Sequence, residues 1–196
     1  MTDPRTDTRA RLLEATTRVY AQHGYAGATT RQIAKAAGVN EVTLFRQFHS
    51  KDALIDEALR AYAARELMTA LPDVPSDPAA EVTAWCESEL ARLRRSGELV
   101  RQCFAAAGEH PEHLRDFSAG LTDAAGLLRE YVGRLVQHGF CDRSSHADAA
   151  VAMLLSVLIS DAVARDMMPR VYPQREATAP AAYASAFLTA CGVPQR

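Results

Sequence analysis

The segment from residue 29 to residue 48 constrains the fold of this chain more than any other, because it fits two short helices separated by one glycine. Thr29 or Thr30 can accept a hydrogen bond from a free backbone N–H at the start of the first helix. Gly38 stands where the chain must turn, and glycine enters a left-handed conformation without steric cost. Asn40 can begin the second helix in the same way as a threonine. The pattern predicts a helix-turn-helix, the unit whose second helix lies in the major groove of DNA.

The second predicted helix has an inward and an outward face. Leu44 and Phe48 are four residues apart, so both can pack into a core. Among the outward side chains, Arg46 suits the paired acceptors of guanine and Gln47 suits adenine, although the alternative is a solvated helix face. Residues at nearby helix N-termini are added to this set, because free N–H groups there attract phosphate. The predicted DNA-contact residues are Thr30, Arg31, Val42, Thr43, Phe45, Arg46, Gln47 and Lys51.

Residues 9–59 resemble the N-terminal domain of the TetR family of bacterial transcription regulators. Besides the helix-turn-helix, the similar segments are residues 11–15, 20–25 and 48–54. The resemblance covers about the first third of the chain, and the remainder matches the family only in length and helical pattern. It implies a DNA-reading N-terminal domain joined to a divergent effector domain. Phe45 departs from the family's common tyrosine, so the phosphate contact of that hydroxyl is not expected here.

Apolar side chains recur at three- and four-residue steps through the rest of the chain, without the alternation typical of strands. Prolines at 72, 75 and 78 mark one linker. We therefore expect an all-α fold of about nine helices. Residues 6–66 form the predicted helix-turn-helix DNA-binding domain. Residues 67–196 form the predicted effector-binding and dimerisation domain, and 196 residues with 48% hydrophobic content can bury such cores.

The charge is divided unevenly along the chain. The formal net charge is −2, but residues 1–55 carry +3 and residues 56–196 carry −5. A basic N-terminal part joined to an acidic remainder fits a protein that binds DNA phosphates through one face. The N-terminus is polar, without the apolar region of a signal peptide, and the longest apolar run, residues 151–163, is interrupted by polar side chains. We expect a cytoplasmic protein with no membrane partner.

Apolar and sulfur-containing side chains in the C-terminal part predict an effector pocket. Ligand pockets are mostly apolar with a few polar groups, which here indicates an apolar or aromatic small molecule. The alternative is that the same side chains form an ordinary core. The predicted pocket residues are Trp85, Cys86, Phe104, Tyr131 and Met153.

The helix expected from residue 146 to about 168 is apolar nearly all round, so we expect it to be buried. Small residues at four-residue steps permit close packing of helices. With the last helix it forms the predicted two-fold interface, by analogy with the four-helix dimer seam of the family, and the alternative is a monomer core. The predicted interface residues are Ala149, Ala152, Ser156, Ser160 and Phe187.

The segment from His110 to His113 has the composition of a metal site. However, His110 precedes a predicted helix and His113 lies in its first turn, so the pair lacks the i, i+4 spacing of helical zinc ligands. We interpret it as a helix cap and expect no metal. A nucleophile elbow and a glycine-rich phosphate loop are also missing from the sequence, so neither a cofactor nor an enzymatic activity is expected.

These observations favour a homodimeric repressor bound to a roughly palindromic DNA operator, from which a small molecule releases it. The alternative is a constitutive DNA-binding, architectural or adaptor protein whose C-terminal half only dimerises.

Overall fold

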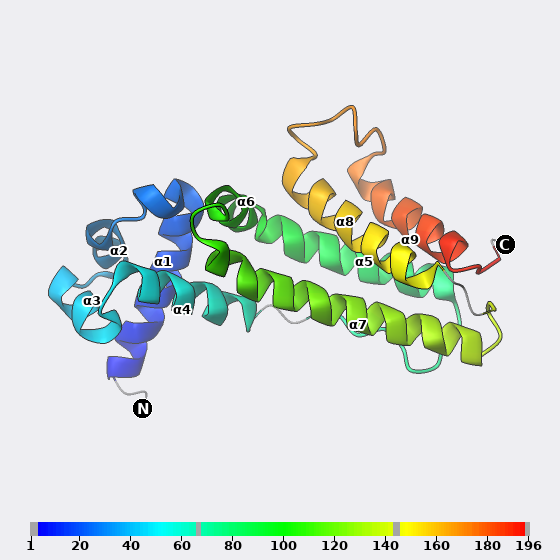
Figure 1. Ribbon diagram of the computed structural model, residues 1–196, viewed down its shortest axis with the longest axis horizontal. Helices are drawn as coiled ribbons and strands as arrows, with labels where there is room; N and C mark the ends of the chain where they lie inside the picture. The colour runs from blue at the N-terminus through cyan, green and yellow to red at the C-terminus, as the bar shows by residue number, and fades with distance from the viewer. Residues whose placement is uncertain (1–3, 66–67, 143–145, 195–196) are drawn as a thin grey trace. The chain divides into compact units, whose positions relative to one another are not determined.

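The computed structural model describes residues 4–65, 68–142 and 146–194. Within these ranges the protein has nine α-helices, two short 3₁₀ helices and no strand, which confirms the predicted all-α fold (Figure 1). The α-helices are α1 (Pro4–Gly27), α2 (Thr30–Ala37), α3 (Glu41–Phe48), α4 (Lys51–Ala63), α5 (Pro78–Arg95), α6 (Gly97–Ala106), α7 (Arg115–Gln137), α8 (Ala147–Ala164) and α9 (Ala179–Ala190). The 3₁₀ helices are η1 (Pro111–Leu114) and η2 (Glu176–Thr178).

The helices form two compact units. Unit 1 consists of Met1–Leu67 and Glu98–Ala119, and unit 2 consists of Met68–Gly97 and Gly120–Arg196. The first division lies one residue from the boundary expected between residues 66 and 67. Residues 98–119, which the sequence placed in the second domain, join unit 1 instead. The chain therefore passes between the units three times.

Unit 1 is built around α1, which packs against α2 and α4. Its core holds Leu12, Tyr20, Ile33 and Leu54, all fully buried. Gly24 was expected to end the first helix, and its φ of 64° interrupts α1 there. Leu99 and Cys103 of α6 belong to the same buried cluster as residues of α1 to α4, so α6 contributes to the core of unit 1.

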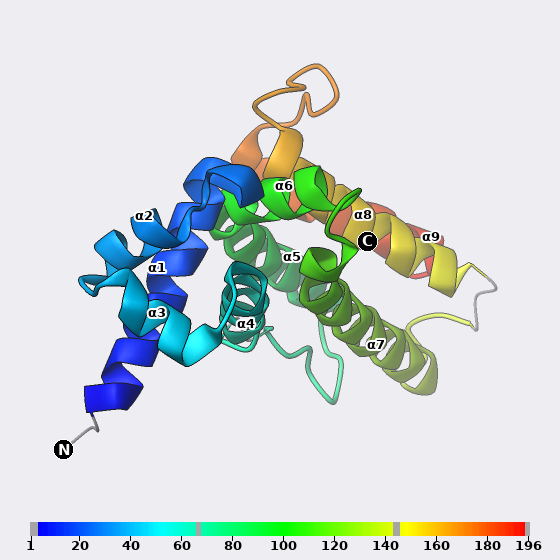
Figure 2. The ribbon, with the colours of Figure 1, turned by 60° about the vertical axis from the view of Figure 1, so that its left-hand side comes forward.

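Unit 2 is built around α5, which packs against α8 and α9. Figure 2 shows α8 and α9 side by side. Trp85 is buried, and its indole N–H donates to the Thr69 carbonyl at 3.1 Å. The Tyr131 hydroxyl, also buried in this core, donates to Glu81. These bonds satisfy the polar ends of two large aromatic side chains that would otherwise be costly to bury.

The expectation that α8 is buried all round is wrong. Ala149, Ala152, Met153 and Ser156 are exposed, and Met153 keeps 69% of its surface accessible. By length and composition α8 could cross a membrane, a test that the core helix of a globular protein also passes. Here α8 packs one face on α5 and α9 and leaves an apolar face uncovered.

Candidate DNA-binding site and effector unit

The helix-turn-helix is closed by its own side chains and backbone. Thr29 and Gln32 form a capping box, in which each side chain accepts a hydrogen bond from the other residue's backbone N–H at 3.2 Å. Gly38 ends α2 with φ 68° and ψ 34°, the left-handed conformation predicted for it. The Asn40 side chain accepts from the Thr43 N–H at 2.9 Å and begins α3. The two predicted helices are thereby confirmed, with Thr29 rather than Thr30 as the cap.

Two arginines of α1 hold the motif in place. Leu44 and Phe48 of α3 are buried, as expected from their spacing. The Arg9 guanidinium lies 4.4 Å from the centre of the Phe48 ring and is paired with Glu57 of α4 at 2.6 Å. Arg11 donates to the last carbonyl of α2, that of Ala37, at 3.2 Å. The inner face of α3 is therefore fixed from two neighbouring helices, which leaves the opposite face to present side chains.

Four of the predicted DNA-contact residues lie on the exposed surface. Val42 keeps 75% of its surface accessible, and Phe45 and Arg46 are exposed on the same helix. Arg31 is exposed on α2. Arg46 is a cation that can read bases, and Arg31 is a cation at a helix N-terminus. Val42 and Phe45 are apolar.

The other four are half-buried, and three of them already make hydrogen bonds within the fold. Thr30 donates its hydroxyl hydrogen to Glu41, and Thr43 donates to the Asn40 side chain at 3.2 Å. The Gln47 carbonyl oxygen is buried without a hydrogen-bond partner in the described part of the chain.

Lys51 is the most strongly engaged of these four. Its ammonium donates to the Tyr25 carbonyl and lies 3.9 Å from the centre of the Tyr25 ring. Burial lowers the pKa of Lys51, against the opposing effect of Asp52. The cation thus ties the start of α4 to the end of α1.

Two features near α3 were missed from the sequence. Lys35 is exposed on α2 four residues after Arg31, so both cations share one face, and that spacing was a readable signal. His49 follows α3 with φ 64°, the one non-glycine residue with positive φ in the described chain. A histidine at this position does not by itself predict that conformation from the sequence.

The predicted pocket residues divide between the two units and between core and surface. Trp85, Cys86 and Tyr131 are buried in the core of unit 2, and burial raises the pKa of the Cys86 thiol to about 12. Met153 lies on the exposed face of α8 in the same unit. Phe104 belongs to unit 1, where its ring packs edge-on against Phe117 at 5.8 Å. The first three side chains act as core, which was the alternative interpretation.

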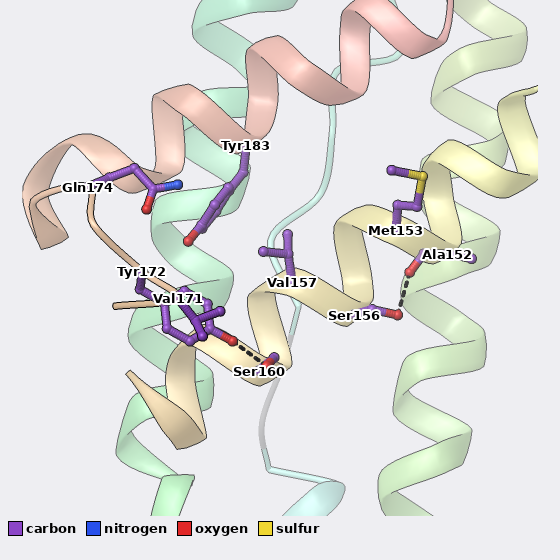
Figure 3. A pocket seen from close by; sticks show the side chains of 9 residues that line it. All are labelled: Ala152, Met153, Ser156, Val157, Ser160, Val171, Tyr172, Gln174 and Tyr183. Atoms are coloured by element: carbon purple, nitrogen blue, oxygen red, sulfur yellow. Dashed lines mark hydrogen bonds between the residues drawn. The ribbon is translucent and has the colours of Figure 1, made fainter. Parts of the chain in front are cut away.

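Unit 2 has an open hollow of about 530 Å³ beside α8. Figure 3 shows side chains of α8, of α9 and of the segment between them around it. Ser160 and the Tyr172 hydroxyl are hydrogen-bonded across its floor. Its lining residues are Ala152, Met153, Ser156, Val157, Ser160, Val171, Tyr172, Gln174 and Tyr183.

The predicted interface residues divide in a similar way. Ala149, Ala152 and Ser156 are exposed on α8 and Ser160 is half-buried. Phe187 points into the core of unit 2 and is buried. The exposed small residues remain available to a second copy, whereas Phe187 stabilises the unit itself.

The His110–His113 segment is not a helix cap. His110 precedes η1 at the N-cap position, but its side chain makes no capping hydrogen bond with the described residues. Its ring stacks instead on Tyr25, with centroids 3.8 Å apart, and His113 is buried.

The known proteins that this chain resembles are transcription regulators. Residues 12–58 match the model of the bacterial regulatory proteins, tetR family. An uncharacterized HTH-type transcriptional regulator of Bacillus subtilis, YvkB, is 23% identical over 78% of this chain and 82% of its own length. The transcriptional repressor AcnR of Corynebacterium glutamicum is 38% identical over 32% of this chain and 34% of its own length. A TetR transcription regulator from Haloarcula marismortui has the same fold, with a TM-score of 0.73 at 16% identity, covering 96% of this chain and 100% of the other.

The capped helix-turn-helix, together with these similarities, indicates a DNA-binding transcription regulator. The family-model match and the relatives above show that residues 12–58 are similar to the DNA-binding domain of the TetR family of transcription regulators.

Proposed function

We propose that this protein represses transcription in the cytoplasm as a homodimer on a roughly palindromic operator, and that a small molecule bound in unit 2 releases it. The observation that carries the proposal is the exposed face of α3, held from behind by Leu44 and Phe48. A helix fixed in this way can enter a major groove without a change in its own fold.

The exposed side chains divide the work of DNA binding. Arg46 is placed to read a base edge, with guanine as its preferred partner. Val42 and Phe45 offer apolar contacts to thymine methyl groups or sugars. Arg31 and Lys35 share one face of α2 and supply charge for phosphates, which fixes register without reading sequence.

The uncovered face of α8 supports the homodimer. Ala149, Ala152 and Ser156 are small and exposed, so the backbone of a second helix can approach closely. A two-fold assembly through this face presents two α3 helices to successive major grooves, which is why the operator is expected to be roughly palindromic.

The hollow beside α8 supports an effector site. Its volume of about 530 Å³ lies in the range of small-molecule pockets, and Met153, Val157 and Tyr172 make its lining largely apolar. Gln174 and Tyr183 add polar groups that could orient an apolar or aromatic ligand. A second copy packed on α8 would close the open side. Release then requires that the ligand bind the DNA-free dimer more tightly than the DNA-bound dimer.

Selection from a random DNA pool tests the reader. The wild-type protein should enrich one roughly palindromic sequence, and Arg46→Ala should relax the preference at one position per half-site by about 1–3 kcal/mol. Arg101→Ala is the matched control, because Arg101 lies on α6 and pairs with Glu98 at 2.6 Å. An unchanged preferred sequence for Arg46→Ala would remove Arg46 as a reader. No enrichment by the wild type would refute sequence-specific binding.

A thermal-shift screen of apolar and aromatic compounds tests the effector. A hit should raise the melting temperature of the free protein and weaken its binding to the selected operator. A hit that stabilises the protein but leaves operator affinity unchanged would support the constitutive DNA-binding alternative.

A further inference from the structure

Three potential metal ligands gather in unit 1, in the connection between α6 and α7. One ligand atom from each of His110, Glu112 and His113 lies within 4.8 Å of the other two. The two imidazole rings are nearly parallel, with centroids 5.0 Å apart and planes inclined by 13°. The Nδ1 atom of His110 is 3.0 Å from a carboxylate oxygen of Glu112. Two nitrogen ligands and one oxygen ligand therefore lie close enough together for one ion to draw them into its coordination sphere.

The environment of His113 adds a second, independent observation. Its side chain is completely inaccessible to solvent, yet its Nε2 atom has no hydrogen-bond partner among the residues that the structure describes. A carboxylate oxygen of Asp56, on α4, lies 3.8 Å from this nitrogen, too far for a hydrogen bond. A buried polar atom without a partner is costly, so its position beside a carboxylate calls for an explanation.

The placement of hydrogen atoms around His113 explains the unpaired Nε2 atom. The Tyr20 hydroxyl lies 3.0 Å from Nδ1 of His113 and 3.4 Å from the Gln102 carbonyl oxygen, which can only accept. Both contacts are satisfied when Tyr20 donates to Gln102 and His113 donates from Nδ1 to Tyr20. Nε2 then carries a lone pair that faces the carboxylate of Asp56, and a cation between the two would bind both.

We propose that His110, Glu112 and His113 bind a divalent transition-metal ion, with Zn²⁺ as the best match, and that Asp56 moves toward His113 to complete the site. Imidazole nitrogens and carboxylate oxygens are the ligands of such ions, and four protein ligands make a closed site. Metal–ligand bonds of about 2.1 Å place the donors of a tetrahedral site about 3.4 Å apart. The separation of 3.8 Å between His113 and Asp56, and separations of up to 4.8 Å among the other ligand atoms, contract when the ion binds.

The surroundings fit a zinc site in two further respects. Metal-binding histidines usually hydrogen-bond through their second nitrogen, and Tyr20 occupies that role for His113. Asp56 and Glu112 are partly exposed, so the ion can enter from solvent while His113 closes the inner side. The bound ion would join η1 to α4, the helix that follows α3 in the chain, and would stabilise unit 1. The site is independent of the effector hollow in unit 2.

Zinc titration of the full-length, chelator-treated protein against a chromophoric competitor tests the site. The wild type should bind one Zn²⁺ per chain and should not bind Mg²⁺ at the same concentration. His110→Ala and Glu112→Gln, which change partly exposed residues, should each weaken zinc binding by at least about tenfold. His138→Ala is the control, since His138 is exposed in unit 2, and it should bind zinc as the wild type does.

Two further measurements complete the test. Circular dichroism should show that the metal-free variants are folded. His113 is left unchanged, because replacing a buried side chain would also perturb the fold. The absorption spectrum of the Co²⁺ form should have the d–d bands of a tetrahedral site and no thiolate charge-transfer band, which excludes binding by cysteines. Substoichiometric zinc, equal affinity in all four proteins, or a thiolate band would overturn the proposal and leave His113 and Asp56 paired through a proton.

Discussion

Asp161 should be the most sensitive single position for the stability of unit 2. Its carboxylate is completely inaccessible to solvent and joins three helices. It accepts hydrogen bonds from Arg94 of α5 at 3.0 Å, from the Tyr183 hydroxyl of α9 at 2.6 Å and from Arg165 at 2.9 Å. Arg165 in turn donates to the Gln174 carbonyl at 2.7 Å, which fixes the segment that lines the hollow. The predicted change is Asp161→Asn, which keeps the shape of the side chain and removes its charge.

The expected loss of stability depends on the arginine charges that Asp161→Asn leaves without a carboxylate partner. Removing one partner of a buried ion pair costs about 3–5 kcal/mol, because the remaining charge is uncompensated. Two features place Asp161→Asn near the lower limit: the amide oxygen can still accept, and the Arg165 and Arg94 side chains keep 15% and 28% of their surface accessible. We expect a loss of about 3 kcal/mol. For a chain of this size that corresponds to a fall in melting temperature of about 6–12 °C.

Urea unfolding followed by tryptophan fluorescence measures this loss within unit 2. Trp85 is the one tryptophan of the chain and is buried in that unit, so its emission reports unit 2. The control is Asp148→Asn, the same chemical change on the exposed first turn of α8, where Asp148 pairs with Arg129. An exposed pair of this kind contributes at most about 1 kcal/mol. If the two variants lose the same stability, the network does not stabilise the unit as argued.

The same network gives a pH dependence of known sign. Burial alone would raise the pKa of Asp161, but hydrogen bonds from Arg165, Tyr183 and Arg94 outweigh it and lower the pKa. A lowered folded-state pKa contributes stability above the unfolded value of about 3.9, and that contribution is lost as the pH falls through the folded value. The difference between wild type and Asp161→Asn should be constant from neutral pH to about pH 5 and should shrink below about pH 4.

The helix-turn-helix was predictable because its signals are local. The caps at Thr29, Asn40 and Ser50 each bond to a backbone N–H three residues further along the chain. Gly38 adopts the left-handed conformation that its place between two apolar patterns required. Interactions that close within one helical turn can be read from a short window of sequence, independently of the rest of the fold.

The division into units was only partly predictable, because it depends on contacts distant in sequence. Leu99 and Cys103 look like ordinary positions of an apolar helical face, yet they pack with the first four helices. His113 meets Tyr20 across 93 residues. A periodic pattern shows that a helix has an apolar face, but it does not show which other face will cover it.

The same limit explains the effector pocket and the ion network. Trp85 and Tyr131 have the composition of a pocket lining and are core, because apolar side chains serve both purposes. In the sequence, Asp161 is one of the polar residues that interrupt the apolar run of residues 151–163. Its pairing with Arg165 at i, i+4 was a local signal that could have been read, whereas Arg94, 67 residues away, could not.

Two further predictions concern DNA binding and assembly. Lys51→Ala should weaken binding to operator and random DNA alike and reduce the slope of log K against log salt by about 0.9, the value for one phosphate contact. An unchanged slope with lowered stability would show that Lys51 serves only to hold Tyr25. Ala152→Glu should dissociate the homodimer, because a carboxylate with no opposite charge would have to be desolvated in an apolar interface at a cost of several kcal/mol. A loss of about 3 kcal/mol raises the dissociation constant by about two orders of magnitude, so light scattering at micromolar concentration should show the monomer mass. Operator binding should fall with it, since one reader makes half of the contacts. Ala91→Glu, at an exposed alanine of α5, is the control and should remain dimeric. A variant Ala152→Glu that keeps the dimer mass would place the interface elsewhere, and a folded wild-type monomer bound to its operator would refute the two-fold model.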